Sequence, residues 1–208
     1  MKASTLNIHS LHQKAKSFYS NRNIIILVLL FLAGLIYGAF AVKSQNSFLY
    51  SKIMPLYMSY VKSKSNLSDL NIFFTTLLLN SSIIVSAYFT GLCAIGIPFV
   101  AMLPAVSGIF IGSVSGYIYQ TYMLKGLGYC GIIIFPSAAI TVASIIFAGR
   151  ESMLMSKNML NLLSQRHNQK YEDFKSYSVR FVIYVSLAAL GALIETVMSH
   201  LFIGLFSF

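Results

Sequence analysis

The long apolar segments of this chain contain few side chains that could take part in chemistry. The ionisable ones are Glu195 and, nearer the end, His200. A charged side chain at mid-membrane depth costs roughly 2.5–3.5 kcal/mol on insertion scales and usually has a partner or a function. One interpretation of Glu195 is that it is protonated, or hydrogen-bonded to polar groups of a neighbouring helix. The alternative is a small transporter or permease-like subunit with Glu195 in its polar path. The candidate partners are Asn80, Ser81, Ser82 and Ser86.

The sequence contains no motif of a known catalytic or metal centre. It has no His-Glu-x-x-His pattern, no paired intramembrane carboxylates and no glycine-rich loop leading to Gly-Lys-Ser/Thr. His200 follows Glu195 by five residues and does not share its helix face well. Cys93 and Cys130 lack metal-ligand spacing and are expected to be buried thiols. We therefore predict no catalytic residue, no cofactor and no metal, and a protein that is not an enzyme.

Long apolar segments are the elements that must position these residues. Of 208 residues, 57% are hydrophobic and 10% are charged, against about 25% charged in a soluble domain. A helix needs ~20 apolar residues to cross ~30 Å of hydrocarbon. The sequence thus predicts an all-α, polytopic membrane helix bundle. Its five expected spans are residues 24–42, 72–95, 99–119, 128–149 and 181–202.

The distribution of Lys and Arg predicts the orientation, because these residues accumulate in cytoplasmic segments. The first 23 residues form an expected basic tail. The first apolar run, 24–41, exceeds the ~7–15 residues of a signal-peptide core and is expected to be a retained anchor. With the N-terminus inside and the C-terminus outside, ten basic residues are cytoplasmic and five are external. The cytoplasmic ones are Lys2, Lys14, Lys16, Arg22, Arg150, Lys157, Arg166, Lys170, Lys175 and Arg180.

Two segments between spans have a character of their own. The connector 43–70 is rich in Tyr and Met and is expected to lie on the outer membrane surface, or to dock a protein. The segment 150–180 is expected to be a cytoplasmic amphipathic loop, lying on the inner leaflet or packed under the bundle. The net charge of +10 is spread over such segments, so it indicates a membrane surface and not nucleic acid.

Glycines mark two features of the expected bundle. Residues four apart share a helix face, and glycine there lets another backbone approach closely. We predict a helix-packing or partner contact at Gly34, Gly38, Gly108, Gly112 and Gly116. Gly91, Gly96 and Pro98 are expected to form a tight turn between spans two and three, with Ile97 held out of helical geometry by Pro98.

These residues also carry a resemblance. The stretch LLLNSSIIVSAYFTGLCAIGIPFVAMLPAVSGIFIGSVSGYIY resembles the membrane core of the stage II sporulation protein M family of endospore-forming Firmicutes. The matching residues are Asn80, Gly91, Leu92, Ile95, Gly96, Ile97 and Pro98, then Gly108, Gly112 and Pro136, and finally Ala192, Leu193, Ile194 and Glu195. The family often continues with Thr-Pro where this chain has Ser199-His200.

The resemblance implies a non-catalytic membrane scaffold. Such a protein recruits or anchors peptidoglycan hydrolases at the sporulation septum while the mother cell engulfs the forespore. The partners implied are the single-span stage II sporulation proteins D and P, and the expected location is the septum or the engulfing membrane. A homo-oligomer without sporulation partners stays open as an alternative.

Overall fold

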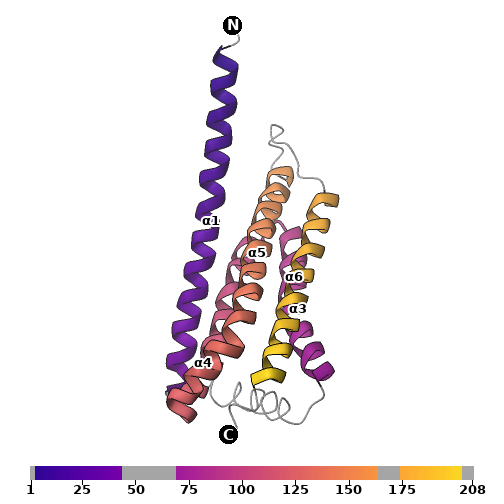
Figure 1. Cartoon of the computed structure of the whole chain (residues 1–208). Coiled ribbons are helices and arrows are strands. Elements are labelled where there is room, and N and C mark those ends of the chain that lie inside the picture. Colours follow the sequence, from indigo (N-terminus) through magenta and orange to yellow (C-terminus); the bar gives the residue numbers. More distant parts are fainter. Residues whose placement is uncertain (1–2, 44–68, 164–173, 203–208) are drawn as a thin grey trace.

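The computed structural model describes residues 3–43, 69–163 and 174–202 as an all-α bundle. Its long helices are α1 (Ala3–Lys43), α3 (Asp69–Leu92), α4 (Ile97–Tyr129), α5 (Phe135–Leu163) and α6 (Phe174–Phe202), with the short π-helix η1 (Cys130–Ile134) leading into α5. Each of the five contains a stretch long and apolar enough to cross a membrane. The prediction of a five-span helical membrane protein is therefore confirmed. The start of α1 and the end of α6 lie at opposite ends of the structure (Figure 1).

The helices run further than the spans expected from hydropathy. The backbone is helical from Ala3, so the expected basic tail continues directly into α1, which projects beyond the other helices (Figure 1). Residues 150–163 belong to α5 and residues 174–180 to α6, where the sequence predicted a loop. The remainder of that loop, and the connector 44–68, lie outside the described residues.

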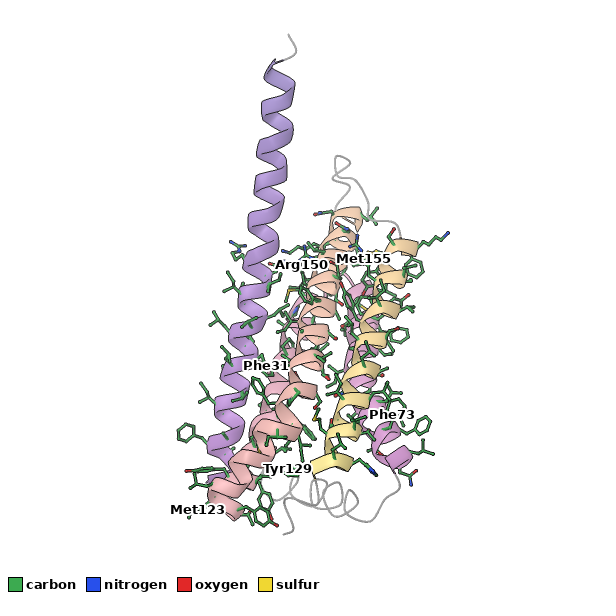
Figure 2. All side chains as sticks on the ribbon, in the orientation of Figure 1. Phe31, Phe73, Met123, Tyr129, Arg150 and Met155 are labelled. Carbon is green, nitrogen blue, oxygen red and sulfur yellow. The ribbon has the colours of Figure 1, made fainter. Side chains whose placement is uncertain are left out.

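Helix α5 organises the bundle because it contacts each of the other four long helices. On one side α5 packs with α3 and α6, and on the other it meets the pair formed by α1 and α4. The most extensive contact between two helices is that of α1 with α4. Figure 2 shows side chains filling the interior between these helices, and large apolar side chains on the outside.

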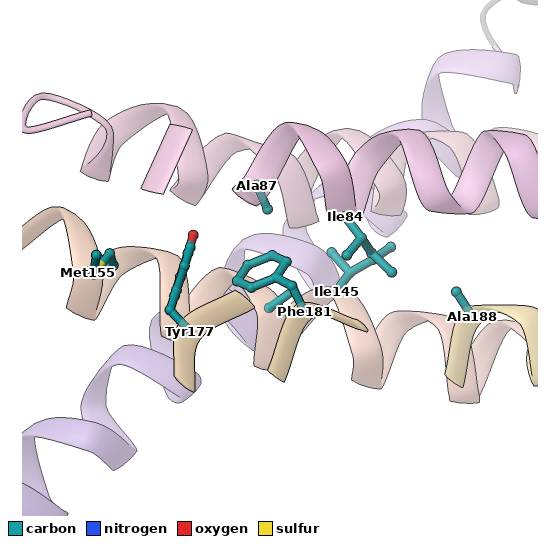
Figure 3. Close-up of a cluster of buried hydrophobic side chains, with 8 residues drawn as sticks. Ile84, Ala87, Ile145, Met155, Tyr177, Phe181 and Ala188 are labelled. Atoms are coloured by element: carbon teal, nitrogen blue, oxygen red, sulfur yellow. The ribbon is translucent and has the colours of Figure 1, made fainter. Parts of the chain in front are cut away.

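The main core lies between α3, α5 and α6. Its buried residues include Ile84 and Ala87 of α3, Ile145 and Met155 of α5, and Tyr177, Phe181 and Ala188 of α6 (Figure 3). A second cluster joins α1, α4 and α5 through Leu27, Val100, Ile146 and Met153. Burial of these side chains stabilises the bundle where helix faces meet, whereas outward side chains such as Phe40 and Leu78 stay exposed, as expected for a surface covered by lipid.

The connection between α4 and α5 contains no long loop. Met123 has φ 50° and ψ −125° inside the segment assigned to α4, so the chain turns there and becomes helical again at once. These angles are those of the first central residue of a type II′ turn, a position that favours glycine. The five-residue η1 follows, two positions before Pro136; a π-bulge of this kind absorbs a local break in the helical hydrogen-bond ladder.

Candidate functional site

The turn between α3 and α4 lies at the end of the bundle where α1 enters it. α3 ends at Leu92 and α4 begins at Ile97, so the break covers Cys93–Gly96. Pro98 was expected to hold Ile97 itself outside the helix. Instead, Pro98 occupies the first turn of α4, where the missing N–H removes no helical hydrogen bond. The bend uses no positive-φ glycine within the described residues.

Close approach is what requires glycine at this turn. A Cβ on Gly91 would lie 2.9 Å from the Cα of Ser152 on α5 and would collide with the hydroxyl of Tyr177 on α6. A Cβ on Gly96 would overlap the carbonyl oxygen of Thr90 and lie 3.0 Å from that of Cys93. Gly91 therefore lets three helices converge, and Gly96 lets the chain reverse tightly.

Hydroxyl groups of α5 and α6 bind the backbone at the end of α3. Ser152 Oγ donates to the carbonyl of Ala87 at 2.7 Å, and Tyr177 OH donates to that of Tyr88 at 3.0 Å. Ser156 Oγ contacts the carbonyl oxygens of Cys93 and Ala94 at 2.7 and 3.2 Å. The last four carbonyls of a helix lack partners within it, and Ala87 and Tyr88 precede those of α3, so the hydroxyls of Ser152 and Tyr177 add a second hydrogen bond to helical carbonyls. Ser156 binds carbonyls of the turn itself. The three hydroxyls join the end of α3 and the turn to α5 and α6.

Aromatic rings reinforce the same junction. Tyr88 of α3 stacks on Tyr177 with ring centroids 5.2 Å apart, and Tyr177 also contacts Phe181 at 4.7 Å. The hydroxyl of Tyr88 lies 3.1 Å from Ser178 Oγ. Aromatic pairs at such distances contribute roughly 0.5–1.5 kcal/mol beyond the burial of their area.

Next to this junction lies a buried carboxylate. The side chain of Glu151 is only 4% exposed. Arg150 Nη1 donates to its Oε1 at 2.9 Å, and Arg180 Nη1 from α6 donates to its Oε2 at 2.5 Å. The Arg180–Glu151 pair fixes α6 against α5. Since two guanidinium groups share one carboxylate, the group of three keeps a net positive charge.

Sequence reasoning missed Glu151. It placed the end of the fourth span at Gly149 because two charged residues follow, and it assigned them to a loop. A usable signal was present: Arg150 and Glu151 have opposite charges, and the sequence SMLMS that follows is again uncharged. An ion pair with satisfied hydrogen bonds can be carried into a buried position, so such a pair need not end a span.

The five predicted packing glycines lie at the contact between α1 and α4. A Cβ on Gly34 or Gly38 would overlap the backbone oxygen of Ala105 or Ile109, respectively. On α4, Gly108 meets Phe31, Gly112 meets Leu35, and Gly116 lies against Ala39 with a Cβ distance of 3.1 Å. The two rows interlock, so the glycines serve a contact inside one chain.

The structure does not bring Glu195 to its expected partners. Tyr88 of α3 is level with Ser178 of α6, and the two helices run in opposite directions. At 1.5 Å per residue, Glu195 then lies roughly 25 Å from that level and Asn80 about 12 Å from it. Ser82 and Ser86 donate instead to carbonyls of their own helix at 2.8 and 2.7 Å.

Other polar candidates lie apart from each other. Cys93 is exposed at the α3–α4 turn and so is not the buried thiol expected, while Cys130 is partly buried in η1. Among residues that the structure describes, no three His, Cys, Asp or Glu side chains group closely enough to hold a metal. The buried hydroxyl of Ser199 has no hydrogen-bond partner among the residues that the structure describes. Among the described residues, the printed ion pairs join Arg150, Glu151 and Arg180, beside the hydroxyl groups at the end of α3.

Comparison with known families gives one match. The family model described as stage II sporulation protein M matches residues 27–200, which include all of α3, α4 and α5, most of α6, and α1 from Leu27 onward. Searches of curated proteins and of solved structures gave no match.

Proposed function

Because the chain belongs to the stage II sporulation protein M family, we propose that it is a non-catalytic membrane scaffold that recruits or anchors peptidoglycan hydrolases during engulfment. Family membership supports a sporulation-related, multi-pass membrane protein. The proposal goes further: it names hydrolases as the cargo and the septum or engulfing membrane as the location. The stage II sporulation proteins D and P are the proposed partners.

The observation that carries this proposal is the extent of the family match, which covers the membrane bundle from α1 to α6. The packing of that bundle is compatible with a rigid platform, because α5 contacts each of the other long helices. The glycine row is occupied by the α1–α4 contact. Single-span partners are therefore proposed to dock elsewhere, on outward faces such as that of α3, where Leu78 is 69% exposed.

We also propose that the N-terminus is cytoplasmic and the C-terminus external. Arg150 and Lys157 lie toward the end of α5, and Lys175 and Arg180 at the start of α6, which is the end of the bundle from which α1 projects. Arg22 belongs to the same end, because Leu27 of α1 packs with Met153 of α5. Basic residues gather on the cytoplasmic side of membrane proteins. A cysteine-labelling experiment with a membrane-impermeant reagent tests this: Cys93, at the same end, should react only after the membrane is opened.

Co-purification from sporulating cells of the native host tests the scaffold. A tagged chain extracted in mild detergent should bring down peptidoglycan-degrading proteins with single membrane spans. Leu78→Trp, which adds bulk outside the core, should reduce their recovery if they dock on this face of α3. Recovery of no peptidoglycan-degrading protein with the wild-type chain would refute the proposal.

A further inference from the structure

The turn at the end of α4 exposes large apolar and aromatic side chains. Every residue of the segment 119–124, called the tip below, is exposed. The large side chains of the tip are those of Tyr119, Tyr122, Met123 and Leu124, with exposed fractions of 53%, 37%, 70% and 83%. Met123 lies at the end of the bundle opposite to the one from which α1 projects (Figure 2). The tip therefore presents an apolar surface directed away from the core.

The base of this turn is closely packed, so the tip is held in a fixed shape. Ile118, Tyr129 and Ile133 form a buried cluster below the tip. A Cβ on Gly126 would lie 2.9 Å from the carbonyl carbon of Ile118, so the two arms of the turn are in direct contact. The side chains of the tip project from this packed base.

Met123 combines a strained backbone with an exposed side chain. Its φ of 50° and ψ of −125° suit glycine better than methionine. A residue with a side chain keeps such angles only where its surroundings impose them. Since the side chain is 70% exposed, burial within the described part of the chain does not account for an apolar residue here. A medium outside the chain that accepts apolar side chains would account for it.

The contact of α1 with α4 gives the depth of the tip. The two helices run in the same direction, because successive glycines of α1 meet successive turns of α4. Gly116 of α4 lies against Ala39 of α1, with a Cβ distance of 3.1 Å. Lys43 follows Ala39 by four residues, and Tyr119 follows Gly116 by three. Tyr119 is therefore nearly level with Lys43, and the tip extends roughly 8 Å further at most.

This depth corresponds to the headgroup layer of one leaflet, the external one in the topology proposed above. On α1, Arg22 and Lys43 enclose an uncharged stretch of roughly 32 Å, close to the thickness of the hydrocarbon layer. The headgroup regions add roughly 5–8 Å on each side. Aromatic rings with a polar group favour this layer. The exposed amide of Gln120 is also compatible with it, because headgroups and water there supply polar partners.

The surface of the tip continues the outer surface of the bundle. Toward the middle of the bundle, Val106 of α4, Ile132 of η1 and Phe135 of α5 are 52%, 41% and 71% exposed at the depth of the uncharged stretch, where lipid covers them. The hydroxyl of Thr121 in the tip donates to the carbonyl oxygen of Tyr117 at 3.0 Å, so it does not depend on water for a partner. One apolar surface therefore runs from the lipid-facing helices to the tip.

We propose that the tip, residues 119–124, is an anchor embedded in the headgroup layer of the membrane. Its aromatic side chains lie among the headgroups, and its apolar side chains contact the adjoining part of the acyl chains. Embedded in this way, the tip fixes the depth of α4 and α5 in the membrane, and the turn between them does not enter bulk water. This role does not depend on hydrolase docking, so either proposal can fail while the other holds.

Tryptophan fluorescence measures the depth of the tip, because the chain has no tryptophan of its own. Tyr119→Trp and Leu124→Trp place single reporters in the full chain, reconstituted in phosphatidylcholine vesicles. Lipids brominated near the headgroup end of the acyl chain should quench both reporters about twofold more than lipids brominated near the chain terminus. Val106→Trp, about 20 Å before Tyr119 along α4, is the deep control and should show the opposite order.

Iodide, present on both sides of the membrane, measures exposure to water. Leu162→Trp, about 18 Å along α5 beyond Arg150, is the aqueous control and should be quenched at least about threefold more than the reporters in the tip. Placing Leu124→Ser beside Tyr119→Trp removes apolar area from the anchor and should raise quenching of that reporter by iodide about twofold. Thr121→Ser in the same background is the matched control and should leave it unchanged. Circular dichroism verifies the helix content of each variant.

Several outcomes would overturn the anchor. Quenching of the tip by iodide as strongly as that of Leu162→Trp would place the tip in water. Protection from both iodide and brominated lipid would show that protein covers the tip, and the quenching order of Val106→Trp would place it below the headgroups. No effect of Leu124→Ser on the Tyr119→Trp reporter would show that the apolar side chains do not hold the tip in the membrane.

Discussion

The contact of α1 with α4 can be tested by adding a single methyl group at Gly112. A Cβ there would lie 2.9 Å from the carbonyl carbon of Leu35 and 3.0 Å from its Cα, and nearer still to the carbonyl oxygen. Real Cβ atoms essentially never come that close to backbone. Since the obstructing atoms are backbone, Gly112→Ala must push the helices apart, by on the order of 1 Å.

The cost follows from that displacement. A gap of 0.5–1 Å already forfeits roughly a quarter to a half of each dispersion contact across an interface. Overpacking in well-packed cores costs typically about 1–3 kcal/mol. Because the contact of α1 with α4 is the most extensive in the bundle, we expect Gly112→Ala to lower the free energy of unfolding by about 2–3 kcal/mol. That range corresponds to a roughly 30- to 150-fold change in the folding equilibrium.

The assay is unfolding by sodium dodecyl sulfate in mixed micelles, followed by far-ultraviolet circular dichroism, because the chain has no tryptophan. Gly131→Ala is the matched control, since a Cβ there meets nothing within 4 Å. Both variants gain the higher helix propensity of alanine, about 1 kcal/mol, so their difference isolates the collision. Equal stabilities of the two variants would show that α1 and α4 do not pack through this glycine.

Three further changes test other parts of the structure by the same unfolding assay. Glu151→Ala removes the buried carboxylate that binds Arg180 and Arg150. Because Arg180 is partly exposed and can reach water, we expect a loss of about 2–3 kcal/mol rather than more, and a loss below about 0.5 kcal/mol would contradict the assigned pair. Met123→Gly relieves a backbone conformation that costs about 1–3 kcal/mol in a non-glycine residue, so stability should rise by roughly 1 kcal/mol after the entropy of glycine is counted; a loss of stability would argue against the positive φ. Tyr177→Phe removes the hydrogen bond to the carbonyl of Tyr88 but keeps the stacked ring, and should cost about 1 kcal/mol, whereas no change would mean that this second hydrogen bond to a helical carbonyl contributes nothing to stability.

Hydropathy was sufficient to predict the five-span architecture. Each span had to satisfy its backbone hydrogen bonds in lipid, and a helix of ~20 apolar residues does so regardless of its neighbours. The four-residue spacing of the glycines also predicted close helix contacts. It did not identify the pairing of α1 with α4, because a row of glycines on one helix is compatible with any partner backbone.

Hydropathy did not predict where the helices end, and it did not predict the cluster of Arg150, Glu151 and Arg180. Charge alone placed a boundary after Gly149, but the charge of Glu151 is compensated by an arginine that is distant in sequence, Arg180. The residues next to Glu151 in the sequence do not predict its pairing with Arg180. Likewise, Met123 falls between the expected spans 99–119 and 128–149, and nothing in the residue types there predicts its positive φ, which glycine would adopt more easily.

The pairing of α1 with α4 has a consequence for the biogenesis of the protein. Helix α1 is synthesised first, yet the helix that covers its glycine face follows α3 along the chain. Helix α3 forms the main core with α5 and α6, which are synthesised after it. During insertion, both early helices therefore stay without their final neighbours until the second half of the chain enters the membrane. A nascent chain that stops after α4 could form the contact of α1 with α4. Its α3 would lack α5 and α6, and would be exposed to the quality-control proteases that remove unassembled spans.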